Sequence, residues 1–264
     1  MTSARFADDA DLARRFSGLE RLFGMHGAAR IRAAHVAVVG IGGVGSWSVE
    51  ALARSGVDEL TLIDLDHVAE SNINRQVHAV QTTIGQAKVQ AMRERIALIN
   101  PACRVHCVEE FVEPGNWPAL LGKAPVDAVI DACDQVRAKT AMAAWARAEA
   151  VHFISVGAAG GKRQAHQVQI EDLARVTHDP LLAQVRNQLR REHGAPREGT
   201  KIGVACVFSR EPVVPADASC AIEDADGSLN CHGYGSLVTV TAGFGQCAAG
   251  WVLNALAAGR GDTG

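Results

Sequence analysis

A glycine-rich loop between an apolar run and an alanine-rich stretch constrains the fold of this chain more than any other feature. Residues 35–39 are apolar and predict a buried strand, and Gly40, Gly42 and Gly45 follow them as Gly-x-Gly-x-x-Gly. The next residues, to about 55, predict a helix. Glycine permits a tight turn and a close approach of phosphate to backbone N–H groups, and the helix offers its positive end to the anion. The loop, completed by Gly43 and Ser46, therefore predicts a phosphate-binding site.

Predicted strands and helices alternate along the first 160 residues. Strands are expected at 60–64, 103–109, 126–131 and 152–156, and helices at 12–33, 85–99 and 135–150. The second half is less regular, with strands expected at 164–170 and 204–209 and a polar helix at 181–193. This pattern is typical of a Rossmann-like, doubly wound α/β fold, with a mostly parallel sheet and helices on both faces. We expect one domain over 1–264, with a nucleotide-binding core at 12–160 and a less regular C-terminal extension at 161–264.

Composition excludes several classes of protein. The formal net charge of −3 argues against a dedicated basic coat for nucleic acid. The seven cysteines include no Cys-x-x-Cys pair, which argues against a disulfide framework and a paired-cysteine zinc site. The first residues hold three aspartates and no apolar run, unlike a signal peptide. We therefore expect a cytoplasmic protein with reduced thiols and without zinc.

Residues 235–258 are almost free of charge, which leaves two interpretations. A stretch of this length can cross a membrane. However, Gln246, Asn254 and three glycines lower its hydrophobicity. A helix buried in the core or in a dimer interface is therefore favoured, and membrane association stays the alternative.

Basic residues after the second strand distinguish between kinds of nucleotide chemistry. Asp64 and Asp66 end that strand, where a carboxylate can accept hydrogen bonds from ribose. A plain NAD dehydrogenase needs no cations here. An enzyme that attacks ATP at its α-phosphate does need them, because its transition state spreads negative charge over phosphoryl oxygens. Arg75 and Lys88 suit that task, and they favour ATP chemistry over hydride transfer.

Two further side chains complete the candidate site. Asn72 can donate a hydrogen bond to the phosphate chain. Asp134 follows the strand at 126–131 and should therefore lie at the same edge of the sheet as Asp64. A carboxylate there can hold Mg²⁺ against phosphate oxygens. The predicted catalytic residues are thus Arg75, Lys88 and Asp134, with Asp134 as the metal ligand.

These motifs resemble the ubiquitin-activating-enzyme-like (HesA/MoeB/ThiF) adenylyltransferases. The matching stretches are 40–46, Asp64-x-Asp66, Ser-Asn-Ile-Asn-Arg-Gln at 71–76, Gly85-x-x-Lys88 and Asp-Ala-Cys-Asp at 131–134. Members of that superfamily use ATP to activate a carboxylate as an acyl-adenylate. The resemblance implies that Asp64 binds ribose, that Asn72 and Arg75 bind phosphates, and that Lys88 contacts the α-phosphate and the reacting carboxylate. It also implies that Asp134 binds Mg²⁺.

The second half is similar to one branch, the bacterial tRNA threonylcarbamoyladenosine dehydratases. The matching stretches are 155–161, 179–181, 203–209 and 231–236, together with 15–16 and 21–24 near the start. The resemblance implies a homodimer that adenylates the threonyl carboxylate of threonylcarbamoyladenosine in tRNA and lets the modification cyclise. It makes 161–264 a substrate-binding and dimerisation extension. Two alternatives stay open: activation of the C-terminal glycine of a sulfur-carrier protein, and an adaptor for a cysteine-desulfurase sulfur acceptor.

The superfamily resemblance also suggests a role for two residue types outside the phosphate site. Cys231 is the best candidate for a cysteine that accepts the activated acyl group, with Cys206 and Cys220 behind it, although a free cysteine is more often inert and buried. Arg15 or Arg21 is a candidate for an arginine that reaches the ATP of the partner protomer.

A tRNA substrate implies a basic surface, because backbone phosphates dominate affinity for nucleic acid. Basic residues gather between 186 and 201, and two more follow the glycines at 160 and 161. We expect the tRNA-facing residues to be Lys162, Arg163, Arg190 and Arg191, and the alternative for the last two is a solvated helix face.

Overall fold

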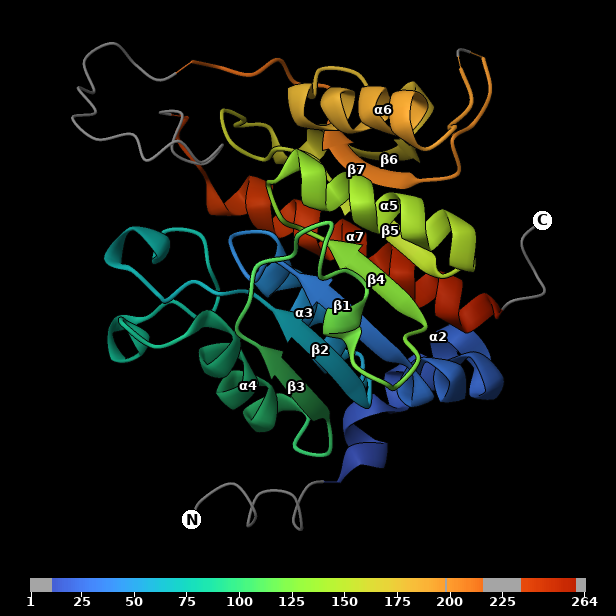
Figure 1. The fold of residues 1–264 in the computed structure, drawn as a ribbon. Helices are drawn as coiled ribbons and strands as arrows, with labels where there is room; N and C mark the ends of the chain where they lie inside the picture. The colour runs from blue at the N-terminus through green and yellow to red at the C-terminus, as the bar shows by residue number, and fades with distance from the viewer. Residues whose placement is uncertain (1–10, 198, 216–233, 260–264) are drawn as a thin grey trace.

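Seven strands form one sheet in the computed structural model (Figure 1), which describes residues 11–197, 199–215 and 234–259. The strand order is β3-β2-β1-β4-β5-β7-β6. Every neighbouring pair is parallel except β6 with β7. The strands are β1 (His35–Val39), β2 (Glu59–Ile63), β3 (Arg104–Val108), β4 (Ala128–Asp131), β5 (His152–Val156), β6 (Val168–Asp172) and β7 (Ala205–Ser209).

Six α-helices of the described residues surround this sheet. Asp11 begins the first by accepting a hydrogen bond from the N–H of Arg14, and Gly24 kinks the same helix because its φ is 70°. Asp179 caps another through the N–H of Leu182, just before Pro180. The helices are α2 (Leu12–Ala33), α3 (Gly45–Arg54), α4 (Lys88–Ile99), α5 (Val136–Glu149), α6 (Pro180–Glu192) and α7 (Val238–Ala258).

The helices divide between the two faces of the sheet. Val36 and Val38 of β1 point to one face, where they pack in a core with apolar residues of α2, α3, α4 and α7. Ala37 and Val39 point to the other, where they pack with α5 and α6. Figure 1 shows α5 in front of the strands and α7 behind them. This is the expected doubly wound α/β fold with helices on both faces.

Residues after 160 extend the same sheet. β7 pairs with β5 in parallel, and β6 closes the edge in the antiparallel direction. α7 returns under the first half, where the Ser48 hydroxyl donates to the carbonyl of Gly245 (3.0 Å). A Cβ on Gly245 would lie 2.4 Å from the Val44 carbonyl oxygen, so this close approach requires glycine. The functional division between 12–160 and 161–264 stays a prediction.

The predicted strand at 164–170 is wrong in extent. Residues Ala165–Gln167 form a 3₁₀ turn, and the strand is Val168–Asp172. The buried Glu211 carboxylate accepts hydrogen bonds from the N–H groups of Arg163 and Gln164. Because that contact binds the backbone at 163–164, pairing with β7 begins only at Val168.

The weakly charged stretch near the C-terminus forms α7, and its apolar side chains are buried. Val240, Phe244 and Val252 are at most 1% exposed and belong to the core on one face of the sheet. The preference for a buried helix is therefore confirmed. Within the described residues, no helix combines the length and apolarity needed to cross a membrane.

Candidate functional site

The glycine loop joins β1 to α3 and needs glycine at two points. Gly40 has a φ of +84°, and a Cβ there would lie 2.8 Å from the carbonyl oxygen of Ala132. A Cβ on Gly45 would lie 1.8 Å from the carbonyl oxygen of Gly40. A Cβ on Gly42, in contrast, would meet nothing within 4 Å. The loop therefore turns tightly on the protein side and leaves open space where a phosphate can approach its backbone.

Asp64 fixes the shape of this loop from the end of β2. Its carboxylate accepts hydrogen bonds from the N–H of Ile41 (2.6 Å) and from the N–H of Asp66 (2.9 Å). Burial raises the pKa of Asp64, and the ammonium of Lys88 opposes that rise. Each oxygen keeps a second lone pair after these contacts, so the predicted ribose contact remains chemically available.

Lys88 is the first residue of α4 and is held at the same edge of the sheet. Its ammonium lies 2.7 Å from the carboxylate of Asp66, and its side chain is only 8% exposed, compared with 53% for Asp66. The backbone N–H of Lys88 donates to the carbonyl of Asp66 (3.0 Å). Contacts with Asp66 thus hold Lys88 beside the glycine loop. Because Asp66 is exposed, another anion can replace it as the partner of the Lys88 ammonium.

A cavity of about 120 Å³ brings most of the predicted site residues together. It is a small pocket at the carboxyl ends of β1, β2 and β4, where open α/β sheets bind ligands. Asp134 is half-buried there, and its carboxylate makes no hydrogen bond or ion pair with the residues that the structure describes. That carboxylate is available to a metal ion. The predicted residues that line the cavity are Gly40, Gly42, Asp64, Asp66, Lys88 and Asp134.

Arg75 and Asn72 lie beside this cavity and do not line it. The aliphatic part of Arg75 is near Gly43, where an added Cβ would lie 3.2 Å from its Cγ. Its guanidinium donates to the carbonyl of Ser71 (2.7 Å) and to the side-chain oxygen of Asn74 (2.9 Å). Asn72 is 9% exposed, and its side-chain oxygen accepts a hydrogen bond from the N–H of Ala69. Arg75 is thus next to the phosphate loop, and Asn72 shapes the turn that carries it.

A buried lysine supports the loop that carries Asp134. The Lys139 ammonium contacts the Asp131 carboxylate (3.0 Å) and the Val156 carbonyl (2.7 Å), and the Ser155 hydroxyl donates to the same carboxylate (2.6 Å). Lys139 and Asp131 are both fully buried. Burial alone would lower the pKa of Lys139, but the neighbouring Asp131 raises it, so the lysine stays charged. The sequence alone does not predict this pair, because helix periodicity does not show which residue faces a carboxylate.

The candidate cysteines differ in position. Cys231 and Cys220 lie outside the described residues. Cys206 is fully buried within β7, and burial raises the pKa of its thiol, so it is not the acyl acceptor that the sequence suggested as a second choice. Cys133 lines the nucleotide cavity and was overlooked within the motif at 131–134. Burial and the Asp131 carboxylate raise the pKa of the Cys133 thiol, which makes it a weak nucleophile.

The predicted tRNA-facing residues are only partly at the surface. Lys162 is 2% exposed, and its ammonium donates to the backbone carbonyl of Glu211 (2.7 Å), so it does not belong to an exposed basic surface. Arg163 is exposed. Arg190 is half-buried and donates to the Pro196 carbonyl (3.1 Å), whereas Arg191 is exposed beside Glu192.

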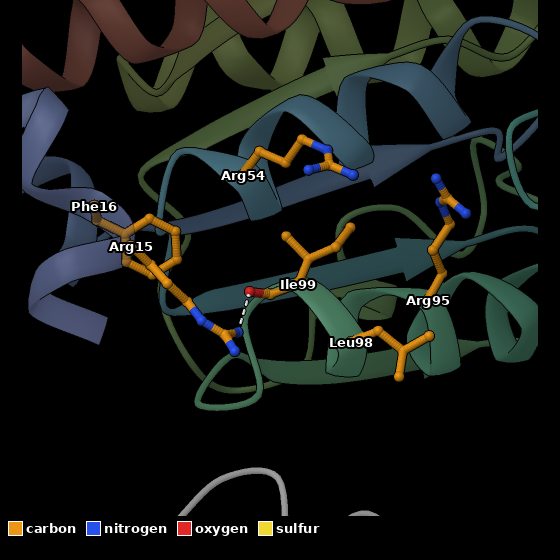
Figure 2. A pocket seen from close by; sticks show the side chains of 6 residues that line it. All are labelled: Arg15, Phe16, Arg54, Arg95, Leu98 and Ile99. Atoms are coloured by element: carbon orange, nitrogen blue, oxygen red, sulfur yellow. Dashed lines mark hydrogen bonds between the residues drawn. The ribbon is translucent and has the colours of Figure 1, made fainter. Parts of the chain in front are cut away.

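Arg15 lines a second cavity, of about 430 Å³. This cavity shares no lining residue with the cavity at the glycine loop. Figure 2 shows its guanidinium next to the end of α4, where it donates to the carbonyl of Ile99 (2.8 Å). Arg54 and Arg95 line the same cavity, and both pair with the buried Glu50. Arg21 is exposed on α2. Within its own chain Arg15 therefore supports α4, and Arg21 is exposed to solvent.

Comparison with known proteins identifies the family of this chain. The ThiF family model matches residues 16–262. The tRNA threonylcarbamoyladenosine dehydratase of Haemophilus influenzae is 42% identical over 246 residues, 92% of this chain and 93% of that protein. The Escherichia coli molybdopterin-synthase adenylyltransferase is 34% identical over 135 residues, 51% of this chain and 53% of that protein.

A solved structure extends the likeness to three dimensions. The crystal structure of the E. coli tRNA N6-threonylcarbamoyladenosine dehydratase TcdA in complex with ATP has a TM-score of 0.85 and 40% sequence identity. The match covers 97% of this chain and 99% of that one. The chain belongs to the ThiF family, and its similarity to the tRNA threonylcarbamoyladenosine dehydratases extends over nearly its whole length.

Proposed function

We propose that this chain catalyses the ATP-dependent cyclisation of threonylcarbamoyladenosine in tRNA. The observation that carries the proposal is the extent of the similarity. It covers more than nine tenths of the chain for the dehydratases and about half for the molybdopterin-synthase adenylyltransferase.

The reaction begins with a carboxylate that is a poor electrophile. Attack on its carbon would expel an oxide or hydroxide ion. Transfer of AMP from ATP to the carboxylate breaks the bond between the α- and β-phosphates, releases pyrophosphate and turns that oxygen into part of a good leaving group. Negative charge develops on the α-phosphate during this transfer, and fixed cations stabilise it without reorganisation. Lys88 lies in the cavity and Arg75 next to Gly43, and these positions support the proposed role of both side chains.

Asp134 is the residue that would hold Mg²⁺, because its carboxylate lines the cavity without a partner among the described residues. Mg²⁺ held there would neutralise part of the phosphate charge. Asp64 holds the glycine loop in its phosphate-binding shape through the N–H of Ile41, and it is the candidate ribose contact. Lys88 exchanges Asp66 for a phosphate oxygen when the triphosphate binds.

Ring closure follows adenylation and needs no further chemical group from the protein. The carbamoyl group is tethered to the same side chain as the activated carbon, so its attack is intramolecular and gains a large effective concentration. Its N–H proton passes to water or to the departing AMP. AMP leaves as the ring forms. The chain then has to orient the modified nucleoside and exclude water, and a covalent link to Cys231 is not required.

The proposal extends to the partners of the chain. Arg163 and Arg191 are the exposed members of the predicted tRNA-facing set. Leu22 is 75% exposed and Met25 67% exposed on α2, which suits a face covered by a second copy in a homodimer. A cysteine-desulfurase sulfur acceptor as partner and a cytoplasmic location stay predictions.

The test is incubation with ATP, Mg²⁺ and tRNA that carries open-chain threonylcarbamoyladenosine. Nucleoside mass spectrometry should show the loss of one water and AMP should accumulate in equal amount. Lys88→Ala should slow the formation of both products about a hundredfold, and the exposed Lys123→Ala is the matched control. No loss of water, together with adenylation of the terminal glycine of a sulfur-carrier protein, would instead support the alternative function.

A further inference from the structure

The amino ends of β1, β2 and β3 carry polar side chains on one face of the sheet. Strand register places His35 of β1 beside Glu59 of β2, and Thr61 of β2 beside His106 of β3. These are the ends opposite the arrowheads in Figure 1. The nucleotide cavity lies at the other end of the same strands, roughly 15 Å away at 3.3 Å per residue. This group of residues is therefore separate from the adenylation site.

Three side chains of this group bring potential metal ligands together. One ligand atom each from His35, Glu59 and His106 lies within 4.8 Å of the others. The Glu59 carboxylate and the His106 Nε2 are already 2.7 Å apart. The His106 side chain is 52% exposed, so its ring can turn without disturbing the core. We call these three residues the His-Glu-His cluster.

A backbone carbonyl sets the tautomer of His35. The Nδ1 of His35 lies 3.0 Å from the carbonyl oxygen of Pro125, so Nδ1 donates and Nε2 carries the lone pair. The hydroxyl of Thr61 lies 2.8 Å from that Nε2 and donates to it, so an ion that binds Nε2 must displace this hydroxyl. Such carbonyl contacts to the second nitrogen are typical of histidines that bind metals.

A neighbouring arginine fixes the orientation of the Glu59 carboxylate. Arg104 donates to one of its oxygens (2.5 Å), which leaves the other oxygen for a ligand beside His106.

We propose that the His-Glu-His cluster binds Zn²⁺ or a related divalent transition ion. Two imidazoles and one carboxylate are a common protein ligand set for such ions, with a fourth position for water. Bonds of 2.0–2.2 Å in tetrahedral geometry place ligand atoms about 3.5 Å apart, which a turn of the His106 ring provides. The absence of Cys-x-x-Cys pairs argues only against zinc sites built from cysteine thiolates. It does not argue against a site built from two histidines and a glutamate.

An ion at this position would link three adjacent strands. Because it would bind the folded chain and not the unfolded one, added Zn²⁺ should raise the melting temperature. Mg²⁺ prefers oxygen ligands in octahedral geometry and should bind weakly here. If the three side chains form only an ion-pair network with a buried histidine, added Zn²⁺ should leave the melting temperature unchanged.

Calorimetric titration of the full-length, EDTA-treated protein with ZnCl₂ tests the proposal. We expect one Zn²⁺ per chain, with at least tenfold weaker binding in His106→Ala and in Glu59→Gln. His166→Ala removes an exposed histidine elsewhere and is the matched control, with unchanged affinity. Circular dichroism checks that each variant is folded.

Cobalt provides a second, spectroscopic readout. Co²⁺ in this site should give the visible bands of a tetrahedral complex, and His106→Ala should lose them. Bands of thiolate-to-cobalt charge transfer would instead assign the ion to cysteines and overturn the proposal. Equal Zn²⁺ affinity in wild type and His106→Ala, or no binding by the wild type, would also overturn it.

Discussion

Replacing the buried Lys139 by methionine should be one of the most damaging single substitutions in this fold. Lys139 and Asp131 are both fully buried, and the lysine ammonium also donates to the Val156 carbonyl. Methionine fills the same volume but leaves the Asp131 carboxylate with only the hydroxyl of Ser155 and the thiol of Cys133 as donors. Loss of one partner of a buried ion pair costs about 3–5 kcal/mol of unfolding free energy.

Urea denaturation followed by circular dichroism measures this cost. For a chain of this size, 1 kcal/mol corresponds to roughly 2–4 °C in melting temperature, so Lys139→Met should melt about 6–20 °C lower than wild type. The double variant with Asp131→Asn should recover part of the loss, because it removes the unpaired charge. Arg137→Met, an exposed position on α5, is the matched control. A cost below about 1 kcal/mol for Lys139→Met would refute the reasoning.

Three further substitutions test the site and its surroundings. Lys88→Ala should lower kcat/KM of the dehydration about a hundredfold, by loss of one cation at the developing phosphate charge, and unchanged turnover would contradict that role. Gly42→Ala should keep wild-type stability, because its new Cβ meets nothing within 4 Å, but should weaken ATP binding about tenfold in calorimetry; equal affinity would argue against a phosphate cradle. Burial lowers the pKa of His78 to about 4, so the folded protein should lose about 3 kcal/mol as the pH falls from 6.5 to 4. His78→Leu should flatten that part of the stability curve, and a wild-type curve that is already level there would contradict the assignment.

The sequence predicts the first half of the fold well because its signals are local. The strand at 152–156 is confirmed at both ends, and the glycine loop joins a strand to a helix as expected. Asp64 and Asp134 gather in one cavity because the carboxyl ends of parallel strands meet at one edge. Both residues follow strand ends in the sequence, so their meeting place required no knowledge of distant contacts.

Contacts between distant segments explain what the sequence did not predict. Lys162 appears in a basic pair after a glycine loop, which suggests a surface, yet the carbonyls of Ser209 and Glu211 surround its ammonium. The pairing of Lys139 with Asp131 and the position of Cys133 in the cavity depend in the same way on how α5 packs on β4. The late start of β6 depends on Glu211, more than forty residues away.

The way β7 joins β5 limits how this molecule can move during turnover. Hydrogen bonds run without a break from β3, beside the nucleotide cavity, across to β6 at the far edge. Enzymes that close two lobes around a substrate need a hinge between the lobes. A single sheet with uninterrupted hydrogen bonding between its strands contains no such hinge. We therefore expect the sheet to stay rigid during turnover. The movements that admit the RNA and then shield the acyl-adenylate from water should occur in the loops that connect its strands and helices.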